Sequence, residues 1–201
     1  HKGVEHQAEI ADEHEYLTYF RDFLTWRKGD AIMLAEANEP PEKIAEYFGD
    51  GDRMHLLFHF VLNQYIYLAL VREDARLIEK ALRMMPDIPQ TAQWAIFLRN
   101  HDELSLDKLS KKEREEVYAA LGPDPDMQLY DRGLRRRLAP MLSDPNKIRM
   151  LTSLMFALPG TPVLWYGDEI GIGDDLSLPE RNSVRTPMQW SNDPNGGFST
   201  A

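Results

Sequence analysis

The sequence predicts an α/β fold in which four parallel strands alternate with helices. Short apolar runs at residues 31–35, 56–60, 94–98 and 162–166 are typical of strands buried on both faces. A segment with helical spacing of its apolar residues precedes each run. Two of the strands lead directly into acidic motifs that contain Glu36 and Asp102. This order of elements is that of half of a parallel barrel or of a small doubly wound sheet.

The composition favours one well-cored soluble domain of 201 residues, with 43% hydrophobic residues and a formal net charge of −10. The negative charge argues against a nucleic-acid partner, and the basic triplet at residues 135–137 is interpreted as the solvated face of a helix. There is no cysteine, which excludes disulfides and thiolate metal sites. No apolar run reaches roughly 18 residues, so we expect no membrane span, and the polar start is not a signal peptide. The cytoplasm is the expected compartment.

The first elements follow from spacing and from helix-breaking residues. Apolar residues at three- and four-residue intervals predict a helix at residues 16–27, which Gly29 and Asp30 end. Pro40 and Pro41 open a short helix that reaches Phe48. Residues 61–71 are apolar nearly all round and predict a buried helix, and residues 76–85 form a second helix.

The later elements are longer and end in an irregular tail. A charged helix is expected at residues 111–121, followed by a break at residues 122–126. The next helical region is interrupted by Pro140 and Pro145 and completed by residues 148–158. Residues 167–201 have no period and predict a long functional loop. We therefore expect a single partial domain over residues 1–201 with a loop-rich tail.

The two carboxylates suggest a sugar-cleaving site. Parallel strands bring their carboxyl ends together, and glycoside cleavage needs one carboxyl group to protonate the glycosidic oxygen and others to stabilise a cationic transition state. In the alternative interpretation, Glu36 caps the helix that begins at Pro40 or forms an ion pair on a rim. The residues by themselves leave both open.

Four ordered motifs carry a resemblance to a known family. The segments at residues 34–38, 97–104, 160–169 and 185–190 resemble, in order and spacing, the second half of the catalytic barrel of the α-amylase family. Within that family, residues 99–104 and 133–140 resemble trehalose synthases. The resemblance implies the C-terminal half of a TIM (β/α)8 barrel, with strands five to eight.

The resemblance also implies roles for individual residues. Glu36 matches the general acid/base at the end of the fifth strand, and Asp102 matches the carboxylate after the seventh strand that stabilises the transition state. His101 would then hydrogen-bond to sugar hydroxyls.

Further positions are implied to bind or enclose the substrate. Asn38 and Glu103 lie in loops that close over the site in trehalose synthases, together with Asp107, where the family usually has glutamate. Arg185, after the last strand, could pair with a carboxylate or reach a sugar hydroxyl.

The family's nucleophile is absent from this sequence, which contains no Gly-Phe-Arg-x-Asp type motif. We therefore expect the chain alone to be inactive and a longer parent enzyme to supply the first four strands.

No metal or other cofactor is assigned, because family calcium would be held by that other half. His55 and His59, four apart in a predicted strand and roughly 13 Å apart, are too distant to share an ion. The expected partners are a disaccharide and a second copy covering the open half-barrel, since cut barrel strands leave exposed edges.

Three functions compete at this point. The first is a fragment of a trehalose synthase, which interconverts maltose and trehalose by intramolecular transglucosylation with retention. The second is a fragment of an oligo-1,6-glucosidase or sucrose isomerase, and the third is a non-catalytic, amylase-like binding module. Residues 99–104 favour the first over the second, and the intact pair Glu36 and Asp102 disfavours the third.

Overall fold

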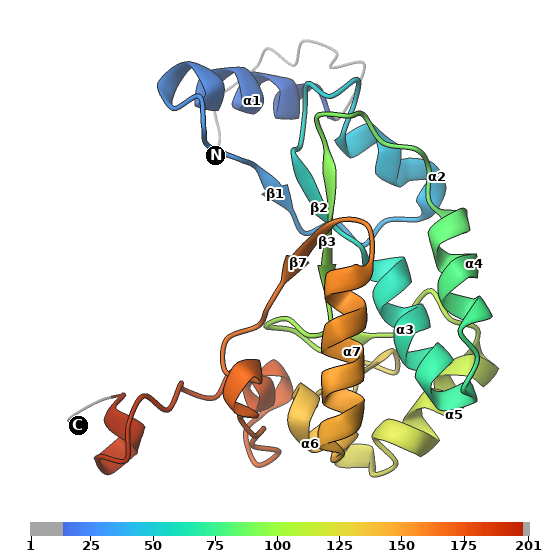
Figure 1. Ribbon diagram of the computed structural model, residues 1–201, viewed down its shortest axis with the longest axis vertical. Helices are drawn as coiled ribbons and strands as arrows, with labels where there is room; N and C mark the ends of the chain where they lie inside the picture. Colours follow the sequence, from blue (N-terminus) through green and yellow to red (C-terminus); the bar gives the residue numbers. More distant parts are fainter. Residues whose placement is uncertain (1–13, 199–201) are drawn as a thin grey trace, which may run out of the picture. The chain divides into compact units, whose positions relative to one another are not determined.

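The computed structural model describes residues 14–198. The chain divides into two compact units, with residues 14–58 and 85–94 in the first and residues 59–84 and 95–198 in the second (Figure 1). The boundary falls inside strand β3 (Gln93–Phe97), between Trp94 and Ala95. Each unit contributes one pair of parallel strands, and the predicted α/β class is confirmed.

The first unit packs a small parallel strand pair against short helices. Strand β1 pairs with β2 in the register Leu34 to Leu56. Its core consists of Ile44, Phe48, Met54, Leu57 and Ala92. The elements of this unit are α1 (Glu15–Arg27), β1 (Leu34–Ala35), α2 (Pro41–Ile44), the 3-10 helix η1 (Ala45–Tyr47) and β2 (Leu56–Phe58).

Helix α1 keeps one side on this unit and exposes aromatic residues on the other. Leu17 packs against the core, and the Arg21 guanidinium donates to the carbonyl of Arg53 at 2.8 Å. Phe20, Phe23 and Trp26 are 60%, 61% and 78% exposed. Helix α1 therefore has the predicted spacing of apolar residues, but the described residues of this unit cover only part of the apolar face of the helix.

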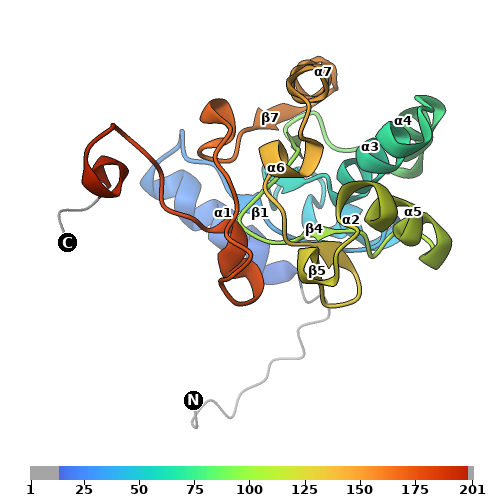
Figure 2. The same ribbon diagram turned by 90° about the horizontal axis from the view of Figure 1, so that it is seen from below.

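The second unit surrounds a buried helix, α3 (Phe60–Arg72), which packs against α4 and α5 (Figure 1). Strand β3 pairs in parallel with β7, and β4, β6 and β5 form a small antiparallel sheet in that order. Strands β4 and β5 of this sheet are labelled in Figure 2. The remaining helices and strands are α4 (Arg76–Met84), β4 (Leu104–Ser105), α5 (Lys111–Leu121), β5 (Gln128–Leu129), β6 (Gly133–Leu134), α6 (Leu138–Leu142), α7 (Pro145–Ala157) and β7 (Thr161–Val163). The 3-10 helices are η2 (Pro125–Met127), η3 (Asp168–Ile170), η4 (Glu180–Val184) and η5 (Pro194–Gly197).

Helix positions were predicted well, and strand ends less well. The predicted strand at residues 31–35 is wrong at its start, because the Met33 amide donates to the His55 imidazole at 2.9 Å instead of joining a ladder. The predicted strand at residues 162–166 ends early, because the chain turns where the Asp168 amide donates to the Trp165 carbonyl at 3.1 Å. Helix α7 begins earlier than predicted, since Pro145 occupies its first turn and Asp144 caps it.

The arginine triplet at residues 135–137 is not the solvated helix face that the sequence suggested. It lies between β6 and α6 and fastens the tail. Arg135 donates to the carbonyls of Leu176 and Leu178, and Arg136 forms a 2.8 Å ion pair with Asp174. Arg137, 1% exposed, donates to the carbonyls of Tyr166 and Val184. The tail has no helical or strand periodicity in its sequence, and contacts with these guanidinium groups hold it in place. Residues 199–201 of the predicted tail lie outside the described part.

No helix in the described part of the chain is long and apolar enough to cross a bilayer. The cytoplasmic location stays a prediction from the sequence.

His59 is the N-cap of α3, where the sequence predicted a strand residue. Its Nδ1 accepts the amide of Leu62 at 3.1 Å, and the side chain is buried. Burial lowers the pKa of His59 to about 4, so the neutral imidazole that can accept this hydrogen bond is favoured.

His59→Asn should make the protein less sensitive to acid. Because the folded-state pKa of His59 lies below its ordinary value of 6.5, the unfolded chain binds the proton more readily, and stability is lost as the pH falls from 6.5 towards 4. Asparagine keeps a capping oxygen but does not titrate. Urea unfolding at pH 7 and pH 4.5 should show that the acid-induced loss is smaller in the variant by on the order of 2 kcal/mol. Equal losses in both proteins would contradict this assignment.

Candidate functional site

The candidate site lies where the chain leaves strand β3. Arg99 and Asn100 are buried, at 2% and 6% exposure, and His101 and Asp102 are partly exposed. Glu103 is buried again before β4 begins. The side chains of His101 and Asp102 are therefore partly open to solvent, with buried Arg99 and Asn100 before them and buried Glu103 after them.

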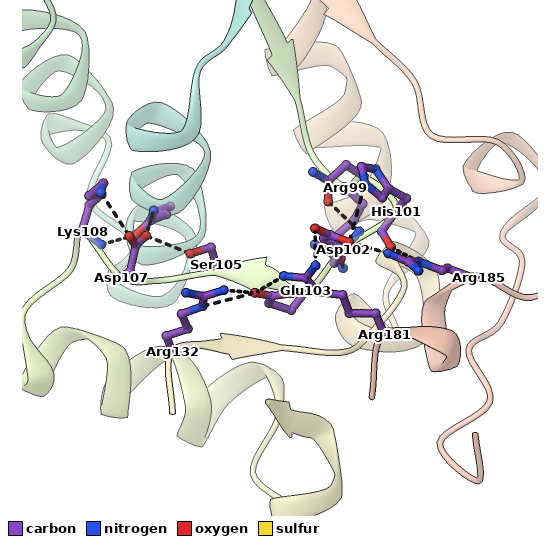
Figure 3. A network of polar contacts seen from close by, with 12 residues as sticks. Arg99, His101, Asp102, Glu103, Ser105, Asp107, Lys108, Arg132, Arg181 and Arg185 are labelled. Atoms are coloured by element: carbon purple, nitrogen blue, oxygen red, sulfur yellow. Dashed lines mark hydrogen bonds and ion pairs between the residues drawn. The ribbon is translucent and has the colours of Figure 1, made fainter. Parts of the chain in front are cut away.

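Asp102 contacts two arginines from the tail (Figure 3). Arg185 Nη2 lies 2.7 Å from Asp102 Oδ1, and Arg181 Nη1 lies 3.0 Å from Oδ2. Arg185 also donates from Nε to the carbonyl of His101 at 2.8 Å, and His101 Nε2 lies 3.6 Å from Asp102 Oδ1. A carboxylate oxygen has two lone pairs, so each oxygen of Asp102 can accept a further donor such as a sugar hydroxyl.

Glu103 is the buried centre of the same network (Figure 3). Its side chain is 3% exposed and accepts from Arg181 Nε at 2.7 Å and from Arg132 Nη2 at 3.1 Å. Burial by itself would raise the pKa of Glu103, but the hydrogen bonds and charges of these arginines outweigh it and lower the pKa. Arg181 therefore bridges the two adjacent acids.

The two carboxylates face three guanidinium groups, those of Arg132, Arg181 and Arg185. Guanidinium donors and carboxylate acceptors of this kind can form hydrogen bonds with the hydroxyl groups of a polyol.

The hairpin between β5 and β6 supports this network. Tyr130 and Asp131 have positive φ angles of 56° and 52°. The Tyr130 ring lies under both Arg132 and Arg181, with 5.6 Å and 5.5 Å between guanidinium carbon and ring centroid. The ring thereby holds the two arginines that bind Glu103.

Asp107 points towards helix α3. Its Oδ1 accepts from Gln64 Nε2 at 2.9 Å and from Ser105 Oγ at 2.8 Å, and Lys108 Nζ lies 3.1 Å from Oδ2 (Figure 3). Gln64 is fully buried. These contacts tie the residue that replaces the family glutamate to a fixed helix.

Asp168 is a second acid with a largely buried side chain. Asp168 lines a pocket of about 160 Å³ between α7 and β7, together with Leu98 and Met155. Burial raises the pKa of Asp168 to about 6, although the positive charges of Arg137 and Arg99 oppose the rise. Arg137 Nη2 lies 3.7 Å from its carboxylate.

The structure brings together His101, Asp102, Glu103 and Arg185 in the second unit. Glu36 and Asn38 belong to the first unit, where Glu36 follows β1 directly and is exposed and Asn38 is partly buried. Sequence reasoning missed Arg181 and Arg132. Arg181 reaches Glu103 across 78 residues of chain, and no motif links the two positions.

Comparison with known proteins agrees with the motifs. The model of the α-amylase catalytic domain matches residues 135–201. The trehalose synthase/amylase of Mycolicibacterium smegmatis is 47% identical over 96% of this chain and 33% of its own length. The trehalose synthase of Thermus thermophilus is 52% identical over 85% of this chain and 18% of its own. The chain thus spans a third or less of the length of these two relatives.

A solved structure shares the fold at low identity. Sucrose 6F-phosphate phosphorylase from Thermoanaerobacter thermosaccharolyticum matches 83% of this chain and 37% of its own length, with a TM-score of 0.64 and 19% identity. The fold predicted from the motifs, the C-terminal half of a (β/α)8 barrel, is confirmed. The family model and the two relatives show that the chain belongs to the α-amylase family of glycoside hydrolases, with a sequence similar to trehalose synthases.

Proposed function

We propose that the chain is part of a longer trehalose synthase that interconverts maltose and trehalose by intramolecular transglucosylation with retention. The observation that carries the proposal is the identity of 47% and 52% to the two trehalose synthases. The cluster around Asp102 supports it, because a carboxylate and an imidazole lie side by side at a strand end and are partly exposed.

In the proposed reaction, Glu36 donates a proton to the glycosidic oxygen as the bond from this oxygen to the anomeric carbon breaks. The glucosyl group passes to an aspartate of the longer protein, because this chain lacks the nucleophile motif. A different hydroxyl of the released glucose then attacks the anomeric carbon and returns its proton to Glu36. Asp102 stabilises the positive charge that develops in both transition states.

Isomerisation also needs water to be kept out while the glucose turns. In the proposal, the segment that carries Arg181 and Arg185 supports the wall of the closed pocket, and Asn38 and Glu103 belong to the loops around it. The substrate is a neutral disaccharide, and no metal takes part in the steps assigned to this chain.

Hydrolysis is the second candidate function, because the Mycolicibacterium relative is named both a trehalose synthase and an amylase. Product analysis separates the two. An isomerase turns maltose into trehalose with little free glucose, whereas a hydrolase turns it into glucose alone.

Glu36→Gln and Asp102→Asn in the longer enzyme should each lower maltose-to-trehalose turnover by roughly 10²- to 10⁴-fold, because each removes a charge or proton used in the transition state. Turnover is measured by separating the sugars. Glu39→Gln and Asp126→Asn are matched controls, and both should stay near wild-type turnover. Near-normal turnover by either site variant would remove its assigned role.

The isolated 201-residue chain should neither isomerise maltose nor release the dye from an aryl α-glucoside, because the nucleophile is proposed to lie elsewhere in the longer protein. The assay compares the purified chain with its Glu36→Gln variant. Turnover that depends on Glu36 would show that the nucleophile is within these residues.

We also propose that the isolated chain self-associates. In this proposal a second copy covers the open half of the barrel, where β1 and β7 are edge strands. The exposed aromatic residues of α1, among them Phe23 and Trp26, add apolar surface that a second copy would also cover. Light scattering at micromolar concentration should give a mass above the monomer, and Phe23→Ser with Trp26→Ser should lower it. A monomer without binding of a hydrophobic dye would contradict the proposal.

A further inference from the structure

Buried polar side chains of helix α3 donate to the carbonyls of Phe97, the last residue of strand β3, and of Leu98, which follows it. Asn63 Nδ2 donates to the carbonyls of Phe97 and Leu98 at 2.8 Å and 3.0 Å. The Tyr67 hydroxyl donates to the same Leu98 carbonyl at 2.9 Å. Asn63 and Tyr67 are 3% and 0% exposed and lie one helical turn apart, on the same face of α3.

These polar groups are unusual for their surroundings. Every residue from 61 to 69 of α3 is buried, and most are apolar. Burying an amide or hydroxyl costs free energy unless the group is hydrogen-bonded. Here both groups donate hydrogen bonds to carbonyls at the end of the strand. An apolar pair would fill the same volume but would leave the Leu98 carbonyl without these two donors.

A third side chain extends the anchoring past the strand. Arg99, 2% exposed, donates from Nε to the carbonyl of Arg136 at 2.9 Å and from Nη2 to the carbonyl of Asp102 at 2.6 Å. The Asp102 amide donates to Asn100 Oδ1 at 3.0 Å. The direction in which residues 99–102 leave the strand is therefore fixed by buried groups at both ends.

We propose that Asn63 and Tyr67 are positioning residues for His101 and Asp102. They touch no substrate in this assignment. They fix the Leu98 carbonyl, and hence the path of the segment that carries the two site residues. The inference rests on the proposed function for its catalytic consequence, because it takes Asp102 to be the carboxylate that stabilises the transition state. A displacement of about 1 Å at such a group can cost up to 10²-fold in rate.

Tyr67→Phe tests the inference, because it removes one oxygen atom and keeps the ring. Tyr65→Phe is the matched control on the same helix: Tyr65 is also buried, at 4% exposure, and its ring packs against Lys80. In the longer enzyme, Tyr67→Phe should lower kcat about 10-fold or more with KM within about twofold of wild type, whereas Tyr65→Phe should change neither. Both are measured at a temperature where circular dichroism shows the variants fully folded. Asn63→Leu should act in the same direction, and the double variant should lose less than the product of the single losses, since the two groups share one carbonyl.

Hydrogen exchange of residues 98–103 supplies a readout that does not depend on the reaction. Exchange in this segment should be faster in Tyr67→Phe than in wild type and unchanged in Tyr65→Phe, and exchange in α3 itself should not differ among the three proteins. Unchanged exchange in Tyr67→Phe would overturn the inference, and so would faster exchange with unchanged kcat. If the wild-type longer enzyme converts no maltose to trehalose, the proposed function fails, and exchange alone then decides whether the anchoring holds.

Discussion

The ion pair between Arg181 and Glu103 is the interaction on which the site depends most. A carboxylate that is 3% exposed needs compensating charge, and a guanidinium with hydrogen bonds at 2.7 Å and 3.2 Å provides it with directional geometry. The same arginine reaches Asp102 and joins the end of β3 to the tail. Removing Arg181 would thus uncover a buried charge and free one side of Asp102 at the same time.

Arginine serves as the structural fastener throughout this region. The described part of the tail has 3-10 helices but no α-helix or strand, and Arg135 and Arg137 bind the carbonyls of Leu176, Leu178 and Val184. One planar group with five donors can bind two carbonyls and an acid together, which lysine cannot do. Hydrogen bonds from arginine side chains can therefore hold a segment that has no α-helix or strand.

Much of the fold followed from the sequence, because helix spacing and helix-ending residues act locally. The limits of α5 were predicted exactly as they occur, from its charged pattern and the Gly122 that follows. The ends of strands were harder, because side chains far away decide them: His55 takes the Met33 amide, and His59 ends β2 by capping α3.

The candidate site shows the same division. Motif order indicated His101, Asp102 and Arg185, which lie together in the second unit. Arg132 and Arg181 could not be predicted, since their contacts join segments that share no spacing rule. The triplet at residues 135–137 was misread for the same reason: three adjacent cations look solvated unless the carbonyls that surround them are known.

The turn at Tyr130 and Asp131 combines a strained backbone with a side chain that contacts the arginines of the site. Two successive left-handed residues without glycine store conformational strain, at a cost of roughly 1 kcal/mol or more each. An Asn-Gly turn would relieve that strain and is what a designer of thermostable variants would choose. It would also delete the ring beneath Arg132 and Arg181. A substitution chosen only to stabilise the turn would therefore remove a contact of the two arginines that bind Glu103. The ion pairs of the site thus restrict which residues this turn can accept.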